Sequence, residues 1–247
     1  MPTKTILICM IVALVLVMVI AITFSVLIPH EPESVEPTKT NDSQRIGVGE
    51  RIKLPEPSYT GNLSVEEALS QRRSIRAYSG ENLTIEEVSQ LLWSAQGITS
   101  AGGGRTAPSA GALYPLELYL VVGDVEGIDK GVYRYRPEEH ELEKVKDGDT
   151  RTELADAALG QACVRDAAID IVFTAVYERT TGKYGERGIR YVQMEAGHAA
   201  QNVYLQAVAL DLGTVVIGAF VDGEVKEIMN MEEQETPLYI LPVGRKG

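Results

Sequence analysis

Residues 188–210 read GIRYVQMEAGHAAQNVYLQAVAL and form the longest helical pattern of the 247-residue chain. Apolar side chains recur there every three or four residues, which places them on one face of an α-helix. They are Ile189, Val192, Ala196, Ala199, Val203, Ala207 and Leu210. Because a stripe of this length must be buried, we expect the helix to pack on another element.

Glu195, His198 and Asn202 share a second face of this helix, again three and four residues apart. A buried or interfacial hydrogen-bond cluster is favoured over a catalytic role, because a single histidine within a helix is usually structural. The catalytic interpretation stays open.

Strand-like and helical patterns alternate on both sides of this segment. Runs of apolar and β-branched residues predict strands at 116–122, 132–135, 141–145, 169–176, 214–220 and 238–243. Capping-box patterns start short helices at Ser64 and Thr84, and helical stretches lie at about 150–160 and 223–230. The order shows no regular βα repeat.

The first 28 residues differ in composition from the rest. Residues 6–28 carry no charge and are apolar apart from Thr23 and Ser25. As a helix this run reaches ~35 Å, longer than the ~30 Å hydrocarbon layer, so residues 1–28 are expected to be a transmembrane anchor. A cleaved signal peptide is the alternative, although a good cleavage site is lacking. The distribution of basic residues favours an extracytoplasmic soluble domain without deciding it.

A proline-rich segment follows the predicted anchor. Residues 29–57 hold five of the eleven prolines among Glu, Ser, Thr and Lys, a composition typical of a flexible linker. The folded domain is therefore predicted at 58–247.

Charge and composition exclude several classes of function. The net charge of −12 argues against a general nucleic-acid binder, since phosphate binding depends on Lys and Arg. Two cysteines and three scattered histidines indicate neither a disulfide framework nor a metal site. The phosphate-loop and Rossmann glycine motifs are both missing from the sequence, so sites of those two types are not expected.

Arg72, Arg73 and Arg76, with Ser74 among them, form a basic cluster. Three guanidinium groups within five residues repel one another unless an anion or carboxylates neutralise them. A phosphate monoester suits them through bidentate bonds and the Ser74 hydroxyl. In the equally open alternative, the arginines complement the end of a helix and pair with nearby glutamates, namely Glu66, Glu67 or Glu81.

Residues 98–112 form a loop of small residues that continues into the APSAGALYP segment at 107–115. Small residues let the backbone approach a flat ligand and leave amide groups free to donate. The A-x-S-x-G pattern around Ser109 is one substitution from a hydrolase nucleophile motif. That motif needs a strand before the serine and a helix after it, so a ligand-contacting hydroxyl is the better interpretation of Ser109.

Two further segments could supply chemistry. Lys183 and Tyr184 stand at the junction between a loop and the long helix, where they could act as a proton donor or base, although most such lysines are simply solvated. The chain ends in a strand followed by Gly244 and Arg245, which would bring a bare amide and a basic side chain to one place unless the tail is frayed.

Together these segments resemble the nitroreductase family of flavoproteins, and within it the SagB-type dehydrogenases. The resemblance covers about residues 62–247 and rests on 72–76, 107–115, 183–191, 195–202, 212–218 and 242–245. It implies an α+β fold, an FMN-binding α/β/α sandwich with a central, mainly antiparallel sheet. It also implies a homodimer that holds FMN at the subunit interface.

The resemblance also implies residue roles. The cofactor-binding residues would be Arg72, Arg73, Ser74 and Arg76 at the phosphate and ribityl chain, Pro108 and Ser109 beside the ring, Val216, Ile217, Gly218 and Ala219 along the ring, and Gly244 and Arg245 at the phosphate. Lys183 and Tyr184 match a Lys-Tyr pair that is catalytic in azoline-oxidising relatives. The same pair occurs in relatives of unknown substrate.

The expected function is an FMN-dependent oxidoreductase that passes hydride from NAD(P)H to an electron-poor acceptor such as a nitro or quinone compound. The alternatives are a thiazoline or oxazoline peptide dehydrogenase using Lys183 and Tyr184, and a non-enzymatic, membrane-tethered flavin or nucleotide sensor. An outward-facing domain would meet little NAD(P)H and would need another donor.

Overall fold

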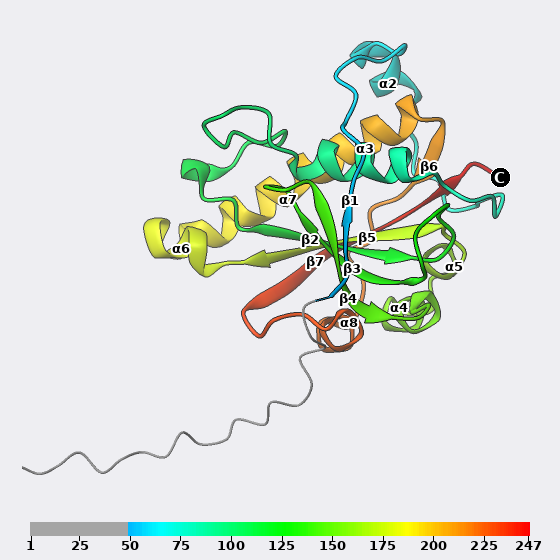
Figure 1. Ribbon diagram of the computed structural model, residues 1–247. Coiled ribbons are helices and arrows are strands. Elements are labelled where there is room, and N and C mark those ends of the chain that lie inside the picture. Colours follow the sequence, from blue (N-terminus) through cyan, green and yellow to red (C-terminus); the bar gives the residue numbers. More distant parts are fainter. Residues whose placement is uncertain (1–48) are drawn as a thin grey trace, which may run out of the picture. The chain divides into compact units, whose positions relative to one another are not determined.

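A seven-stranded antiparallel sheet is the central layer of the protein in a computed structural model that describes residues 49–247 (Figure 1). Its order is β1-β4-β3-β2-β5-β7-β6. The strands are β1 (Arg51–Lys53), β2 (Leu116–Val122), β3 (Gly131–Arg136), β4 (Glu141–Asp147), β5 (Ile169–Val176), β6 (Leu212–Thr214) and β7 (Glu235–Arg245). The predicted α+β architecture with an antiparallel sheet is confirmed.

Helices cover both faces of the sheet. α3 (Ile85–Gln96) and α7 (Arg187–Ala209) pack on one face, and α4 (Arg151–Ala157), α5 (Ala162–Arg165) and α8 (Asp222–Met229) pack on the other (Figure 1). Strand alternation divides the two cores: Phe173 of β5 faces the first pair, whereas Val172 faces the second group. The remaining helical segments are α2 (Val65–Gln71), α6 (Glu178–Tyr184) and the 3₁₀ turn η1 (Ala110–Ala112).

The helix signals in the sequence correspond to physical contacts. Ser64 and Thr84 both complete capping boxes, at α2 and α3. The apolar stripe of α7 is buried from Val192 to Ala207, while Ile189 at its start is 44% exposed. The stripe therefore packs as predicted over the part of α7 that crosses the sheet.

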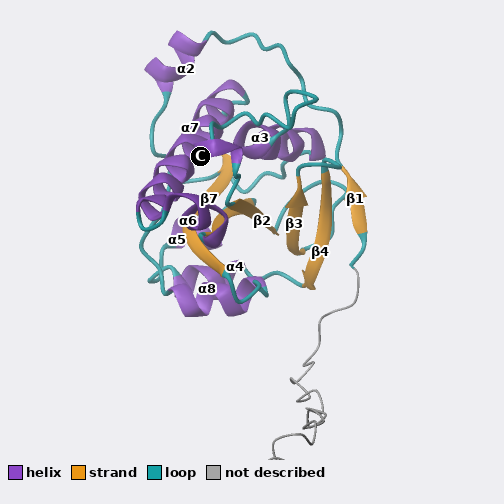
Figure 2. Cartoon of the chain, turned by 90° about the vertical axis from the view of Figure 1, so that its left-hand side faces the viewer, coloured by secondary structure: helices purple, strands orange, loops and turns teal. Residues whose placement is uncertain are grey.

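The folded domain begins before residue 58, so the predicted end of the linker is wrong. Arg51–Lys53 form β1, which pairs with β4 at the edge of the sheet (Figure 2). Leu54 is buried, and the carbonyl of Pro55 accepts a bond of 2.6 Å from Ser89 Oγ. A three-residue strand among prolines has the composition of a linker. What makes it a strand is its pairing with β4, which lies far away in the sequence and leaves no local signal.

The strand predicted at 214–220 is also wrong. β6 ends at Thr214, and beyond it only Ile217 forms a bridge, with Ile240. The Val216 N–H donates to Tyr204 Oη at 2.8 Å instead of to a neighbouring strand. A helix side chain thus interrupts a run that is apolar enough to be a strand.

The predicted anchor and residues 29–48 of the predicted linker lie outside the described residues. Within residues 49–247, no helix has the length and apolar character needed to cross a membrane.

Candidate functional site

Tyr204 of α7 joins two segments that the sequence analysis placed in one site. Its hydroxyl lies 3.2 Å from Ser74 Oγ and accepts the Val216 N–H at 2.8 Å. Beside this contact the Ile75 N–H donates to the Thr214 carbonyl at 2.9 Å. The basic cluster and the chain after β6 therefore lie together, as the resemblance implied. The sequence analysis missed Tyr204, which is one more residue in an amphipathic helix.

The three arginines of the cluster make different contacts. Arg72 Cζ lies 5.1 Å from the ring centroid of Tyr204, and Arg76 is exposed. Arg73 Nη1 donates to the carbonyls of Ser70 and Arg72, which complements the end of α2 as one interpretation predicted. Within residues 49–247 no carboxylate forms an ion pair with any of the three, so the predicted glutamate pairs are not formed. Unneutralised positive charge remains at this surface, which favours an anion.

Arg245 and Gly244, predicted to bind phosphate, have partners inside the protein. The Arg245 guanidinium contacts both carboxylate oxygens of Glu87 at 3.1 Å, and its Nε donates to the Asn82 carbonyl. Gly244 is buried, and a Cβ there would lie 2.8 Å from the Tyr78 ring. This geometry gives both residues contacts inside the protein, and their place on the phosphate stays a prediction.

The 216–219 segment is only partly open to a ligand. Ile217 is buried, and its N–H donates to the Ile240 carbonyl at 2.9 Å. Val216 donates to Tyr204, as described above, whereas Gly218 and Ala219 are exposed. The exposed part of the segment is therefore its last two residues, of which Ala219 accepts a bond from Gln161 Nε2 at its carbonyl.

The loop of small residues meets the Lys-Tyr pair. Gly111 in η1 has φ +66°, and a Cβ on it would lie 2.7 Å from Tyr184 Oη and 2.9 Å from Lys183 Nζ. Lys183 is exposed and Tyr184 is half-buried, with its ring edge-to-face on Tyr191 at 5.2 Å. Both residues end α6, a helix that the sequence analysis had assigned to a loop. Glycine suits this position because of its positive φ, and a larger residue would also displace the ends of the Lys183 and Tyr184 side chains.

Ser109 starts this turn and connects it to α7. Its Oγ accepts the Tyr114 N–H at 2.9 Å and is hydrogen bonded to the carboxyl of Glu195, which is 3% exposed. Burial raises the pKa of Glu195 to about 7, although Ser109 and the Arg105 charge act in the opposite direction. Pro108, beside Ser109, is exposed. The Ser109 hydroxyl is thus committed to a carboxyl group, and no strand precedes it as a hydrolase motif requires.

The predicted polar cluster on α7 is divided. Asn202 Nδ2 donates to the Thr106 carbonyl at 3.2 Å, so Asn202 and Glu195 both hold the 98–115 loop. His198 is exposed. The hydrogen-bond interpretation is therefore right for two of the three residues.

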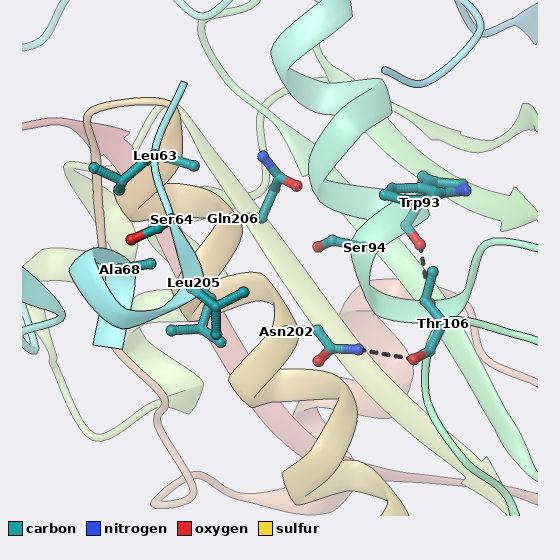
Figure 3. Close-up of a pocket in the computed structure, with 11 residues that line it drawn as sticks. Leu63, Ser64, Ala68, Trp93, Ser94, Thr106, Asn202, Leu205 and Gln206 are labelled. Atoms are coloured by element: carbon teal, nitrogen blue, oxygen red, sulfur yellow. Dashed lines mark hydrogen bonds between the residues drawn. The ribbon is translucent and has the colours of Figure 1, made fainter. Parts of the chain in front are cut away.

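A pocket of about 250 Å³ opens next to this loop, between α2, α3 and α7 (Figure 3). Its wall is mainly apolar, and Thr106 and Asn202 are its contacts with the loop. Ala68, Trp93 and Leu205 are among the apolar lining residues. No local sequence pattern indicates this pocket, because its wall comes from three separate helices.

Comparison with known proteins identifies the family. The model of the nitroreductase family matches residues 69–245. This chain belongs to the nitroreductase family. The predicted family is confirmed, and with it the enzyme class, an oxidoreductase.

Relatives of this nitroreductase-family chain fall into two groups. The Methanocaldococcus jannaschii protein MJ1384, named as a nitroreductase, is 49% identical over 195 residues, which cover 79% of this chain and 96% of that protein. The Escherichia coli microcin B17-processing protein McbC is 29% identical over 182 residues, covering 70% of this chain and 67% of McbC.

A solved structure supports the same fold. The crystal structure of a nitroreductase from Anabaena variabilis has a TM-score of 0.72 and 35% identity, over 81% of this chain. The match spans 42% of that longer protein.

Proposed function

We propose that this chain is an FMN-dependent oxidoreductase that binds the FMN phosphate at Arg72, Arg73 and Arg76. The observation that carries the proposal is the absence, within residues 49–247, of a carboxylate partner for these guanidinium groups in a protein of net charge −12. Charge-assisted bidentate bonds to a phosphate would neutralise them. Ser74, held on Tyr204, adds a hydroxyl at the same place.

The residues around the cluster fit the rest of the cofactor. Gly218 and Ala219 present exposed backbone next to the chain that Tyr204 fixes, where a flat ring can approach closely. When bound, FMN supplies two-electron hydride chemistry. The protein's part is to bind the phosphate, orient the ring and deliver protons, for which Lys183 and Tyr184 are the candidates.

NAD(P)H is the proposed donor, and an electron-poor compound is the proposed acceptor. For a quinone the net reaction consumes NAD(P)H, one proton and the quinone, and yields NAD(P)⁺ and the hydroquinone. The acceptor gains two electrons and two protons. A proton donor beside the ring therefore accelerates the reaction without changing its balance.

Two chains are proposed to form the active enzyme. Large apolar side chains are exposed on α2 and α7: Val65 is 64% exposed, Leu69 54% and Met194 52%. Burying such side chains against a second copy is favourable, at about 25 cal/mol per Å² of apolar surface. Light scattering of the purified protein tests this: a monomer at micromolar concentration would contradict it.

Membrane attachment through residues 6–28 also stays a proposal, supported by the length and uncharged composition of that run. Protease treatment of sealed vesicles tests the side. An extracytoplasmic domain should be digested in intact right-side-out vesicles, and a protected domain would place it inside.

The second candidate is a peptide azoline dehydrogenase. It is favoured by the contact of Lys183 and Tyr184 with the loop at Gly111, and by the similarity to McbC, a protein named for microcin B17 processing. Removing hydride and a proton from an azoline needs a base next to the cofactor, which Lys183 would provide. A heterocycle-containing peptide that is oxidised only when Lys183 is intact would support this candidate.

The test of the proposed function uses the full-length chain in detergent. Addition of FMN should give a yellow protein, and anaerobic NADH or NADPH should bleach it, after which a quinone should restore the colour. The Arg165→Ala variant, which alters an exposed arginine paired with Asp166, serves as the control and should behave like the wild type. Failure to retain FMN contradicts the proposal. Retention of FMN that no pyridine nucleotide reduces would favour the sensor instead.

A further inference from the structure

The turn against which Lys183 and Tyr184 lie, at residues 109–114, is conformationally strained at Ala112 and Tyr114. Positive φ angles occur at Gly111 (66°), Ala112 (54°) and Tyr114 (45°). Residues with side chains rarely adopt this region, and they remain there only where surrounding contacts hold them. The contacts that hold this turn therefore decide the shape of the surface under the pair.

Ser109 supplies two of those contacts. Its carbonyl accepts the Ala112 N–H at 3.1 Å and its Oγ accepts the Tyr114 N–H at 2.9 Å, so both strained residues with side chains are tied to one serine. A hydroxyl has a single proton to donate, and the hydrogen bond to Glu195 uses it. The orientation of Ser109 thus depends on Glu195.

Glu195 holds Ser109 from a buried position on α7. It is 3% exposed on α7, between Val192 and Ala199, which are both fully buried against the sheet. Its Oε1 has no hydrogen-bond partner within residues 49–247. A buried acid with one unsatisfied oxygen costs stability, so the position is better explained by its effect on the turn than by packing.

We propose that Glu195 is a positioning residue for Lys183 and Tyr184, acting through Ser109 on the strained turn against which both functional groups lie. This inference rests on the proposed function, in which that pair exchanges protons with the substrate. In this role Glu195 acts on the pair only through Ser109 and the turn. By fixing the turn, it fixes the position of Gly111 and therefore the positions of Lys183 Nζ and Tyr184 Oη, which lie against that glycine.

The charge of Glu195 changes within the physiological range. Its pKa, raised by burial to about 7, lies where an enzyme commonly works. The charged side chain that acts on it from the loop is Arg105, which also pairs with Glu138 and lies 4.6 Å from the Tyr114 ring centroid. Lys183, at the end of α6, contacts the same turn at Gly111. Ionised Glu195 accepts a stronger bond from Ser109, so the turn is held more firmly above pH 7 than below it.

The first test measures the turn without any cofactor. Amide hydrogen exchange at Tyr114 is followed in the full-length chain for the wild type, Glu195→Ala, Glu195→Gln and Ser109→Ala. We expect exchange at least tenfold faster in Glu195→Ala and Ser109→Ala. In Glu195→Gln, whose amide oxygen still accepts from Ser109, we expect exchange like that of the wild type below pH 7, where Glu195 is neutral. Glu153→Gln, an exposed change on α4, is the matched control. Unchanged exchange in Glu195→Ala overturns the proposal.

The second test measures turnover against pH. In the wild type, kcat should change with a midpoint near pH 7, and Glu195→Gln should abolish that midpoint while FMN affinity stays within twofold. In Glu195→Ala, kcat should fall at least tenfold with KM little changed. A midpoint that survives in Glu195→Gln contradicts the proposal. If Glu195→Ala does not fold, the pH dependence in Glu195→Gln decides.

The two proposals fail differently. A chain that never binds FMN refutes the proposed function, while the exchange measurement still decides whether Glu195 holds the turn. A chain that binds FMN and turns over normally in Glu195→Ala refutes the positioning role alone.

Discussion

Two buried glutamates, Glu235 on β7 and Glu195 on α7, show how differently this fold treats the same side chain. Glu235 is fully buried, accepts a 2.6 Å bond from the Tyr119 hydroxyl and lies 2.9 Å from Arg134 Nη2. Glu195 is bonded to the Ser109 hydroxyl, and its Oε1 has no hydrogen-bond partner in the part of the chain that the structure describes. Burial raises the pKa of both.

The difference between them is the cation. Arg134 also contacts Glu117 at 3.2 Å, so the acids around β2, β3 and β7 share a positive charge inside the sheet. Among the described residues, the cation that acts on Glu195 is Arg105, through its charge and without an ion pair. A neutralised acid holds the sheet together, whereas Glu195, bonded to the Ser109 hydroxyl without a paired cation among the described residues, persists beside the strained turn that contacts Lys183 and Tyr184. Unfavourable local energies of this kind concentrate where function requires them.

The largest effect should come from removing the shared cation. Arg134→Ala leaves the buried Glu235 without its partner, which should lower the free energy of unfolding by about 3–5 kcal/mol. Denaturant unfolding followed by circular dichroism measures this. The exposed Arg165→Ala should cost under about 1 kcal/mol. If Arg134→Ala lowers the free energy of unfolding by under about 1 kcal/mol as well, Arg134 does not stabilise Glu235 and the two glutamates do not differ in this way.

The next effect concerns the pair that Glu195 is proposed to position. Lys183→Ala should reduce kcat by about 100-fold, because a positioned proton-transfer group contributes about that much or more. FMN affinity should stay within about twofold, since Lys183 lies at the end of α6, against the turn at Gly111, and not among the arginines. Steady-state kinetics measures kcat, and flavin fluorescence measures the affinity for FMN. Unaltered kcat would mean that Lys183 is only solvated.

The pH dependence of stability sharpens the comparison further. The folded pKa of Glu195, about 7, is above its ordinary value of 4.5, so the folded state holds this proton more tightly. Its contribution to stability is present below pH 4.5 and is lost as the pH rises to 7. Glu195→Gln should remove roughly 2 kcal/mol of that decline. Asp170, also buried with a raised pKa, keeps its own slope in both proteins, so the difference between the two curves isolates Glu195. If the stability curves of the wild type and Glu195→Gln run parallel between pH 4.5 and 7, the pKa of Glu195 is not raised by folding.

The smallest effect separates arginines with and without acidic partners. Arg76→Ala should weaken FMN binding about tenfold, since a charged hydrogen bond is worth ~1.5–3 kcal/mol. Arg245→Ala should mainly lower stability, because its guanidinium is bound to Glu87. Fluorescence titration with FMN, paired with thermal unfolding, distinguishes the two. If both variants weaken FMN binding equally and Arg245→Ala leaves the stability unchanged, Arg245 also binds the phosphate.

Local patterns predicted much of the fold. The stripe from Val192 to Ala207 and the capping boxes at Ser64 and Thr84 depend on neighbours along the chain, so their residues alone identify them. The central strands β2 and β5 are likewise runs of buried apolar residues.

Contacts between distant segments escaped prediction. β1 is a strand only because β4 pairs with it, and the chain after Thr214 leaves the sheet because Tyr204 takes the Val216 amide. The same holds for the site. Motifs indicated the arginines and the Lys-Tyr pair, but the Glu87 partner of Arg245 and the Ser109 partner of Glu195 depend on how the elements pack.

The central claim is that the arginines at 72–76 hold the phosphate of FMN, and its most direct test is the stoichiometry and affinity of FMN on the full-length chain. We predict one FMN per chain in the wild type and in Arg165→Ala. In Arg72→Ala/Arg73→Ala/Arg76→Ala we predict binding weaker by about 100-fold or more, because several charged bonds are lost together. A wild-type protein that takes up no FMN, or a triple variant that binds it as tightly as the wild type, would contradict the account.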